Sequence, residues 1–141
     1  ETVEKPGNIG AMLRTCDAAG VDALILCEAQ TDFFNPNVIR ASLGAVFSVP
    51  IGSASNDEVL EFLKNNNISI YSAVVENSKD YKNFEYDKAS AIVIGTEHDG
   101  LSNFWVKNSD ERIKIPMKGK IDSLNASVSA AILIYEAIKK R

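Results

Sequence analysis

The sequence contains few of the residues that metal or redox sites need. Among its 141 residues are two cysteines, Cys16 and Cys27, and one histidine, His98. Two cysteines outside a C-x-x-C pair indicate neither a disulfide framework nor a zinc site, and we expect reduced cytosolic thiols. There is no signal-peptide pattern, and no apolar run approaches the ~20 residues of a membrane span. We therefore expect a cytoplasmic protein that uses no metal and no membrane.

The sequence also lacks a strong excess of charge of either sign. The composition of 45% hydrophobic and 24% charged residues is ordinary for one globular domain and excludes disorder. The net charge of −4 argues mildly against nucleic acid as a partner. However, residues 56–111 hold 11 acidic and 5 basic side chains, whereas the rest holds 8 acidic and 10 basic. The basic part, which includes Arg14, Arg40, Lys118, Lys120 and 139–141, is either a local basic face or a set of scattered solvated charges.

Apolar runs that alternate with helical patterns indicate the fold class. Short apolar runs typical of buried strands span 21–27, 68–75, 91–95 and 112–115. Helical patterns span 8–19, 36–42 and 57–65, and residues 76–88 look like a loop. This alternation predicts an α/β fold with a mostly parallel sheet flanked by helices.

The last helical pattern, from Ser123 to Ile138, is apolar around nearly its whole circumference. A helix on an open sheet normally leaves one side in solvent, so this pattern predicts burial on most sides. Such a helix is wrapped by its own chain or by a second subunit.

The first candidate site is the segment 6–15. Gly7 and Gly10 allow close approach of a ligand to the backbone, and Asn8 is a candidate helix cap. Arg14 follows in a helix of small and apolar residues. It is either a surface ion-pairing residue or a guanidinium that holds a phosphate with two hydrogen bonds.

The second candidate site, residues 94–102, follows the strand at 91–95, where ligands bind in parallel α/β sheets. Its glycines, Gly95 and Gly100, match neither a dinucleotide fingerprint nor a phosphate loop. Glu97 is a candidate ligand contact, backbone clamp or base. His98 has no second histidine or cysteine at metal-ligand spacing, so a metal site is not expected.

The third candidate site, residues 113–125, leaves a strand at Pro116, turns through Gly119 and enters the last helix at Ser123 or Asn125. Ser123 is either an ordinary helix cap or part of a site. The exposed amides of this turn suit the edge of an adenine ring.

Together these segments resemble the SpoU/TrmH branch of the SPOUT RNA methyltransferases. The resemblance rests on Asn8-x-Gly10-x-x-x-Arg14, on Gly95-x-Glu97-x-x-Gly100-Leu101, and on Ile115-Pro116-Met117 followed by Ser123-Leu124-Asn125. The stretch 40–47 also looks like that family, and the similarity covers about residues 6–141. The order of the three motifs makes it specific.

The resemblance implies an α/β fold whose C-terminal part forms a deep trefoil knot, with the last helix threaded through a loop. It also implies S-adenosylmethionine as cofactor and a homodimer joined through the knot region. The residues implied in cofactor binding are Gly95, Thr96, Glu97, Gly100, Ile115, Met117, Ser123, Leu124 and Asn125. Leu124, Val128, Ile132 and Tyr135 are expected to be buried on the partner subunit.

The reaction implied is methyl transfer to a ribose 2′-hydroxyl of rRNA or tRNA, which leaves S-adenosylhomocysteine. The residues implied in catalysis are Arg14, Asn8, Glu97, Ser123 and Asn125. Arginine stays protonated and is a poor base, so we expect Arg14 to clamp the target phosphate. The RNA phosphate or a water then accepts the proton.

The sequence departs from the family pattern at His98-Asp99, where small or basic residues are common. The strand expected before the first motif is absent. Residues 1–141 are therefore interpreted as a catalytic domain without that strand and without any N-terminal RNA-binding domain.

Two other functions remain open. One is a catalytically weak relative that binds RNA or assists assembly, although the retained motif residues speak against it. The other is a small-molecule α/β domain, which would need a glycine loop after its first strand.

Overall fold

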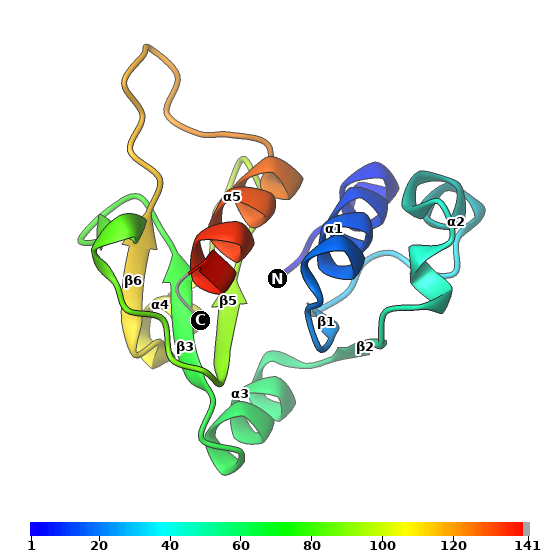
Figure 1. The fold of residues 1–141 in the computed structure, drawn as a ribbon, viewed down its shortest axis with the longest axis horizontal. Helices are drawn as coiled ribbons and strands as arrows, with labels where there is room; N and C mark the ends of the chain where they lie inside the picture. The colour runs from blue at the N-terminus through cyan, green and yellow to red at the C-terminus, as the bar shows by residue number, and fades with distance from the viewer. Residues whose placement is uncertain (140–141) are drawn as a thin grey trace.

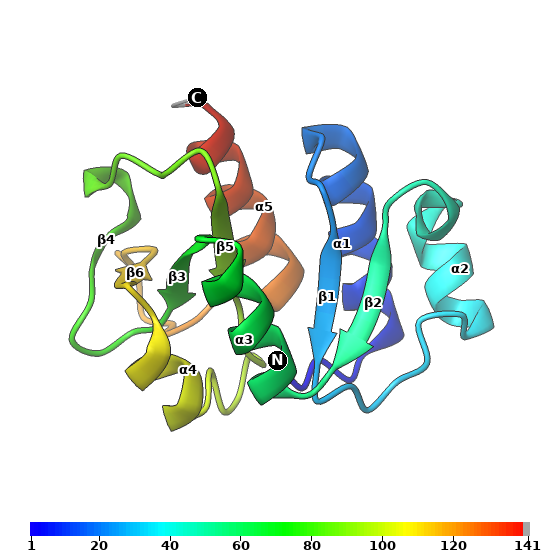
Figure 2. The ribbon, with the colours of Figure 1, turned by 90° about the horizontal axis from the view of Figure 1, so that it is seen from below.

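The computed structural model describes residues 1–139, in which parallel strands are covered by helices on both faces (Figures 1 and 2). The helices are α1 (Pro6–Ala19), α2 (Pro36–Ser42), α3 (Asn56–Asn65), α4 (Asn103–Asn108) and α5 (Ala126–Lys139), with short 3-10 turns at Ala45–Phe47 and Tyr81–Asn83. The strands are β1 (Leu24–Cys27), β2 (Ile51–Ala54), β3 (Ser69–Ala73), β4 (Lys79–Asp80), β5 (Ser90–Val93) and β6 (Glu111–Lys114). Every strand pair is parallel, in the orders β1-β2 and β4-β6-β3-β5.

Local sequence signals explain most helix boundaries. Pro36 stands in the first turn of α2, and the Asn35 side chain accepts a hydrogen bond from the Asn37 amide. Helix α3 begins with a capping box between Ser55 and Glu58. Helix α1 ends at Gly20, whose φ of 66° is the left-handed conformation that favours glycine.

Alternate residues of β5 face opposite layers. Val93 packs with residues of α3 and with Trp105 of α4, whereas Ile92 packs with Leu133 and Ala137 of α5. Helices α1 and α5 lie side by side on the second face (Figure 2). This packing confirms the predicted parallel α/β sheet flanked by helices, while the knot stays a prediction. No helix within residues 1–139 is long and apolar enough to span a membrane.

The last helix begins later than the first residue of its apolar pattern, and its burial is uneven. Helix α5 begins at Ala126 rather than Ser123, and its buried residues are Ala126, Ala130, Leu133 and Ala137, which lie along one face. Val128 and Tyr135 remain 46% and 49% exposed. Most of the other residues of α5 are half-buried, so the described chain covers most sides of the helix at least partly and leaves one stripe, through Val128 and Tyr135, open. Lys139 ends α5, and the basic residues 140 and 141 lie outside the described part.

Candidate active site

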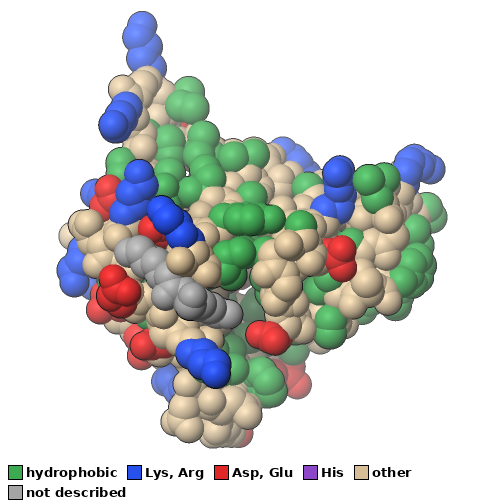
Figure 3. All heavy atoms as spheres, viewed as in Figure 1, with side chains coloured by type: hydrophobic (Ala, Val, Ile, Leu, Met, Phe, Trp, Pro, Cys, Tyr) green, Lys and Arg blue, Asp and Glu red, His purple; other side chains and the backbone are tan. Residues whose placement is uncertain are grey.

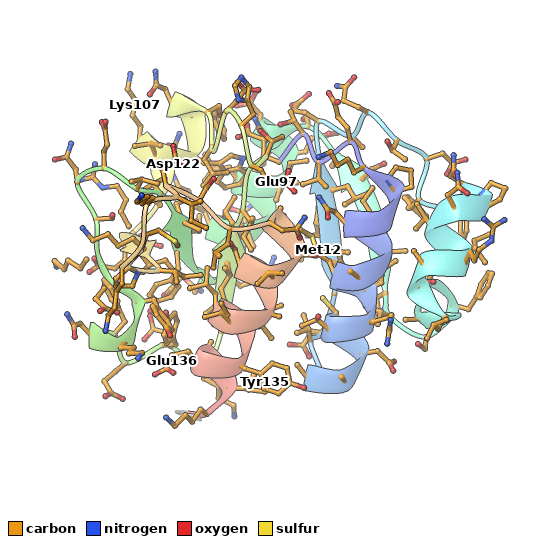
Figure 4. All side chains as sticks on the ribbon, turned by 90° about the horizontal axis from the view of Figure 1, so that it is seen from above. Met12, Glu97, Lys107, Asp122, Tyr135 and Glu136 are labelled. Atoms are coloured by element: carbon orange, nitrogen blue, oxygen red, sulfur yellow. The ribbon has the colours of Figure 1, made fainter. Side chains whose placement is uncertain are left out.

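A cluster of three side chains joins the three sequence motifs. The Asn8 amide nitrogen Nδ2 donates to Glu97 Oε1 at 2.8 Å, and Asn125 Nδ2 donates to the same oxygen at 2.9 Å. Asn125 Nδ2 also lies 3.0 Å from Asn8 Oδ1. The backbone amide of Ala126 adds a contact of 3.3 Å to Glu97 Oε1. One carboxylate therefore ties the start of α1 to the start of α5, as Figure 4 shows for Glu97.

The expected capping role of Asn8 is wrong. Helix α1 begins earlier, with Pro6 in its first turn and Lys5 as an N-cap that makes no side-chain hydrogen bond. Asn8 therefore lies inside the helix. Its side chain, buried to 8% exposure, is directed at Glu97 instead of at the backbone of its own helix.

The sequence predicts that Gly10 lets a ligand approach the backbone closely. The structure contradicts this, because α2 covers Gly10. A Cβ atom at Gly10 would lie 2.5 Å from Ala41 Cβ and 2.8 Å from the Ala41 carbonyl carbon. Glycine is needed here because α1 and α2 pack closely. Gly7 has no neighbour within 4 Å of such an atom.

The loop after β5, residues 94–102, presents Glu97 from a closed turn. The Gly100 amide donates to the Thr96 carbonyl at 3.1 Å, and the Asp99 amide donates to Thr96 Oγ1 at 3.0 Å. A Cβ atom at Gly95 would lie 2.1 Å from the Gly100 carbonyl oxygen, so the turn needs glycine at this position. Gly100 has a φ of 67°, in the left-handed region that favours glycine.

Asn125 rather than Ser123 caps α5. Asn125 Oδ1 accepts from the Ser127 amide at 3.0 Å and from Ser127 Oγ at 2.6 Å. The Ser123 hydroxyl is exposed, and among residues 1–139 its one hydrogen bond is donated to Asp122 Oδ1, at 3.2 Å. The prediction of Ser123 as a cap is therefore wrong, and Ser123 does not join the three-residue cluster.

Glu97 is held as a carboxylate. Its own backbone amide lowers its pKa most, and the donors on Asn8 and Ala126 lower it further, whereas partial burial acts in the opposite direction. The pKa is therefore below the ordinary value of 4.5. A carboxylate with a lowered pKa is a weak proton acceptor, so this geometry favours orientation over general-base work.

Arg14 lies outside the cluster. At 3.6 residues per turn, six residues place it ~240° around α1 from Asn8. It is exposed, and no described residue within 1–139 forms a hydrogen bond or ion pair with its guanidinium. It lines a groove of about 790 Å³ between α1, residues 42–48 and α5. Asp17, on the next turn of α1, is the other charged residue of this lining and accepts a hydrogen bond from Ser48.

Hydrophobic and basic side chains occupy different parts of the same face. Apolar side chains gather over its centre, and lysine or arginine side chains stand at the tip of the projecting loop 115–125 (Figure 3). In that loop Ile115, Met117 and Leu124 are half-buried, whereas the lysines at 118 and 120 are exposed. The loop therefore offers apolar side chains on the path from β6 to the cluster.

Two side chains that form hydrogen bonds near the site were not predicted from the sequence. The Glu1 carboxylate binds Ser102 at the end of the loop 94–102, and the Ser127 hydroxyl binds Asn125. No spacing signal marks either residue, because each acts through a tertiary or capping contact. His98 is exposed, and its Nε2 lies 3.9 Å from Asp99 Oδ1. Within residues 1–139, no three His, Cys, Asp or Glu side chains are grouped closely enough to hold a metal ion.

Comparisons with known proteins agree on one family. The model of the SpoU rRNA Methylase family matches residues 1–135. A protein of Staphylococcus aureus (strain COL), named for the TrmH family of tRNA/rRNA methyltransferases, is 40% identical over 140 residues. That match covers 99% of this chain and 56% of the relative, so the chain spans about half the length of the curated relatives it matches.

Solved structures share the fold at high similarity. A crystal structure of an RNA 2′-O ribose methyltransferase superposes with a TM-score of 0.91 and 41% identity, covering 98% of this chain and 53% of that one. The rRNA methyltransferase of Sinorhizobium meliloti with bound AdoMet gives a TM-score of 0.93 and 31% identity, with 98% and 53% covered. The cluster of motif residues, the family model and these relatives lead to one conclusion: the chain belongs to the SpoU family of rRNA methylases.

Proposed function

We propose that this chain is the catalytic domain of an RNA methyltransferase. It transfers a methyl group from S-adenosylmethionine to a ribose 2′-hydroxyl of rRNA or tRNA and leaves S-adenosylhomocysteine. The observation that carries the proposal is the convergence of Asn8, Glu97 and Asn125 from three separate motifs. The S. aureus relative named for tRNA/rRNA methyltransferases and the 2′-O ribose methyltransferase structure support this reaction. A cytoplasmic location fits such a substrate.

The residues at the ends of β5 and β6 fit a nucleoside cofactor. The turn between Gly95 and Gly100 brings backbone close to backbone, and Ile115, Met117 and Leu124 supply half-buried apolar surface. Sites of this kind combine apolar walls with a few polar groups. The proposed contacts are Gly95, Thr96, Glu97, Gly100, Ile115, Met117, Ser123, Leu124 and Asn125. S-adenosylmethionine supplies an activated methyl group when it is bound.

The protein's own work is alignment. Glu97 accepts hydrogen bonds from Asn8, Asn125 and the Ala126 amide, so it fixes the relative position of the three segments. Asn8 and Asn125 orient the ribose, together with the exposed hydroxyl of Ser123, which lies two positions before Asn125. Holding reactants in register is the main source of rate when the methyl donor is already activated.

Arg14 is proposed to clamp the RNA phosphate next to the target ribose. Its guanidinium is exposed in the groove, without a partner among residues 1–139, and can form two parallel hydrogen bonds to a phosphate. It stays protonated, so it cannot remove the hydroxyl proton itself. We assign that proton to the RNA phosphate or to a water molecule.

The experiment compares Arg14→Ala with Arg112→Ala, which removes an exposed arginine from β6. Labelled methyl transfer to total rRNA and tRNA should fall on the order of 100-fold in Arg14→Ala, because the RNA is no longer aligned. It should be unchanged in Arg112→Ala. Affinity for S-adenosylhomocysteine, measured by calorimetry, should stay within about threefold in both.

Unchanged transfer in Arg14→Ala contradicts the assigned role. Cofactor binding by the wild-type protein without any transfer to either RNA favours a catalytically weak relative instead.

We also propose a homodimer through the α5 side of the groove, which leaves Arg14 on the α1 side open to RNA. Val128 and Tyr135 of α5 are about half exposed, and with Ile132 they line the groove. Large apolar side chains gathered on one surface are typical of a protein interface. This surface and the half-buried Leu124 would explain why α5 is apolar on sides that its own chain leaves uncovered.

A further inference from the structure

Residue Glu1 contacts both ends of the loop 94–102. Its backbone nitrogen donates to the Ile94 carbonyl at 2.8 Å, where the loop leaves β5. Its carboxylate accepts from the Ser102 amide at 2.7 Å and from the Ser102 hydroxyl at 2.6 Å, where the loop enters α4. One residue at the beginning of the chain thus spans a loop about 100 positions away.

The loop between these anchors is a closed unit. The hydrogen bonds of Thr96 to Asp99 and Gly100, together with the close contact between Gly95 and Gly100, fix its internal shape. Glu97 projects from this unit toward Asn8 and Asn125. The direction in which the unit faces therefore depends on how its two ends are held.

Glu1 is itself held by the protein core. Asn56 Nδ2 donates to Glu1 Oε1 at 2.7 Å, and Asn56 Oδ1 accepts from the indole nitrogen of Trp105 at 2.8 Å. Trp105 is fully buried, so Asn56 has a fixed orientation. The position of the Glu1 carboxylate is thus fixed by contacts with α3 and α4 that are independent of Ser102. Hydrogen bonds to a charged acceptor are among the stronger ones in proteins.

We propose that Glu1 is a positioning residue that holds the loop 94–102 in the orientation needed for cofactor binding. The inference rests on the proposed function, in which this loop binds S-adenosylmethionine. Glu1 acts through Ser102 and the loop and is not assigned any contact with the cofactor or the RNA. Its loss should therefore affect the order of the loop and the affinity for cofactor together.

The test compares Glu1→Gln with Glu28→Gln. Glu28 is a matched control, because its carboxylate accepts the Asn56 amide at 2.8 Å at the start of α3 and is not bonded to the loop. Both variants lose one charged acceptor at a helix start. Calorimetry measures the binding of S-adenosylhomocysteine. Hydrogen exchange of the Asp99 and Gly100 amides is followed without cofactor. Thermal unfolding checks that each variant is folded.

Glu1→Gln should weaken binding about tenfold, equal to about 1.4 kcal/mol. It should speed exchange of the Asp99 and Gly100 amides by a similar factor. Glu28→Gln should change neither, although its unfolding temperature falls comparably. Equal effects of the two variants on affinity and exchange overturn the positioning role. Absence of binding by the wild-type protein overturns the proposed function, and unchanged exchange in Glu1→Gln overturns the inference by itself.

Discussion

Asn8 and Glu97 are 89 residues apart in sequence, and their side chains meet at 2.8 Å. The contact joins the first motif of the chain to the second, and Asn125 extends it to the third. Amide groups can donate to a carboxylate without adding a second charge. The cluster therefore holds three segments together with a single negative charge.

Replacing Asn8 with aspartate tests this charge arrangement. Asn8→Asp removes a donor and places a second carboxylate against Glu97, so the free energy of unfolding should fall by about 2 kcal/mol at pH 7. The loss should shrink below pH 5, where one of the two carboxylates can take up a proton. Urea unfolding at both pH values measures this. Asn8→Ala is the control: it removes the donor without adding a charge, so its deficit should shrink less on acidification than the deficit of Asn8→Asp.

The second prediction concerns acid stability. Glu97 and Glu1 each accept backbone amides at the start of a helix, α5 and α4 respectively. Their pKa values in the folded protein lie below 4.5. For Glu1, burial alone would raise the pKa, but the hydrogen bonds from Ser102 and Asn56 outweigh it. A carboxyl group whose pKa is lowered by folding stabilises the protein at every pH above its pKa in the unfolded chain. This contribution is lost as the pH falls through its pKa in the folded protein.

The free energy of unfolding of the wild-type protein should therefore decrease steadily below about pH 4.5. In Glu97→Gln the same measurement should start lower at neutral pH and change less with acid, because one titrating carboxyl group is absent. Parallel curves for the two proteins between pH 5 and pH 3 would mean that Glu97 contributes no stabilising charge.

Much of the fold could be predicted from the sequence, because most helices and strands depend on local residue patterns. The apolar runs at 21–27 and 68–75 contain β1 and β3, whereas β5 and β6 each begin one residue before the runs at 91–95 and 112–115. The helical patterns at 36–42 and 57–65 begin within a residue of the starts of α2 and α3. Strand β2 was missed, because Ile51-Gly52-Ser53-Ala54 has little strand character of its own and is defined by its pairing with β1.

Only part of the candidate site could be predicted from the sequence. Motif spacing selected Asn8, Glu97 and Asn125 together, and the structure brings them into contact. The same pattern failed for Asn8 as a cap and for Gly10 as a ligand surface, since both roles depend on partners distant in sequence. The direction of Arg14 away from the cluster likewise follows from where α1 begins and packs.

Two glycines of α1 should respond oppositely to alanine. Gly10→Ala places a methyl group 2.5 Å from Ala41 Cβ and forces α1 away from α2, so stability should fall by about 1–3 kcal/mol. Gly7→Ala meets nothing within 4 Å and should raise stability by about 0.5 kcal/mol, because alanine restricts the unfolded chain. Chemical denaturation of both variants decides this, and a neutral Gly10→Ala would contradict the close helix crossing.

Two positions on the loop 115–125 test the apolar pocket. Leu124→Arg puts a charge into surface that we assign to the cofactor, and affinity for S-adenosylhomocysteine should fall at least 100-fold. Ile121→Arg, on the same loop but 64% exposed, should keep wild-type affinity. Calorimetry on both variants measures the difference. Equal affinity in the two would move the cofactor away from Leu124.

The proposed dimer predicts a specific effect at Tyr135. This side chain is 49% exposed and reaches from α5 toward α1 in the groove (Figure 4). Tyr135→Glu would replace apolar contact surface with a carboxylate that loses its hydration at the interface, which disfavours association. Sedimentation velocity should show a dimer for the wild-type protein and a monomer for Tyr135→Glu. The control Phe62→Glu changes a side chain of similar exposure, 51%, on α3 and should remain dimeric. A wild-type monomer, or a dimer that survives Tyr135→Glu, would place the interface elsewhere or remove it, and the uncovered apolar side of α5 would then require another partner.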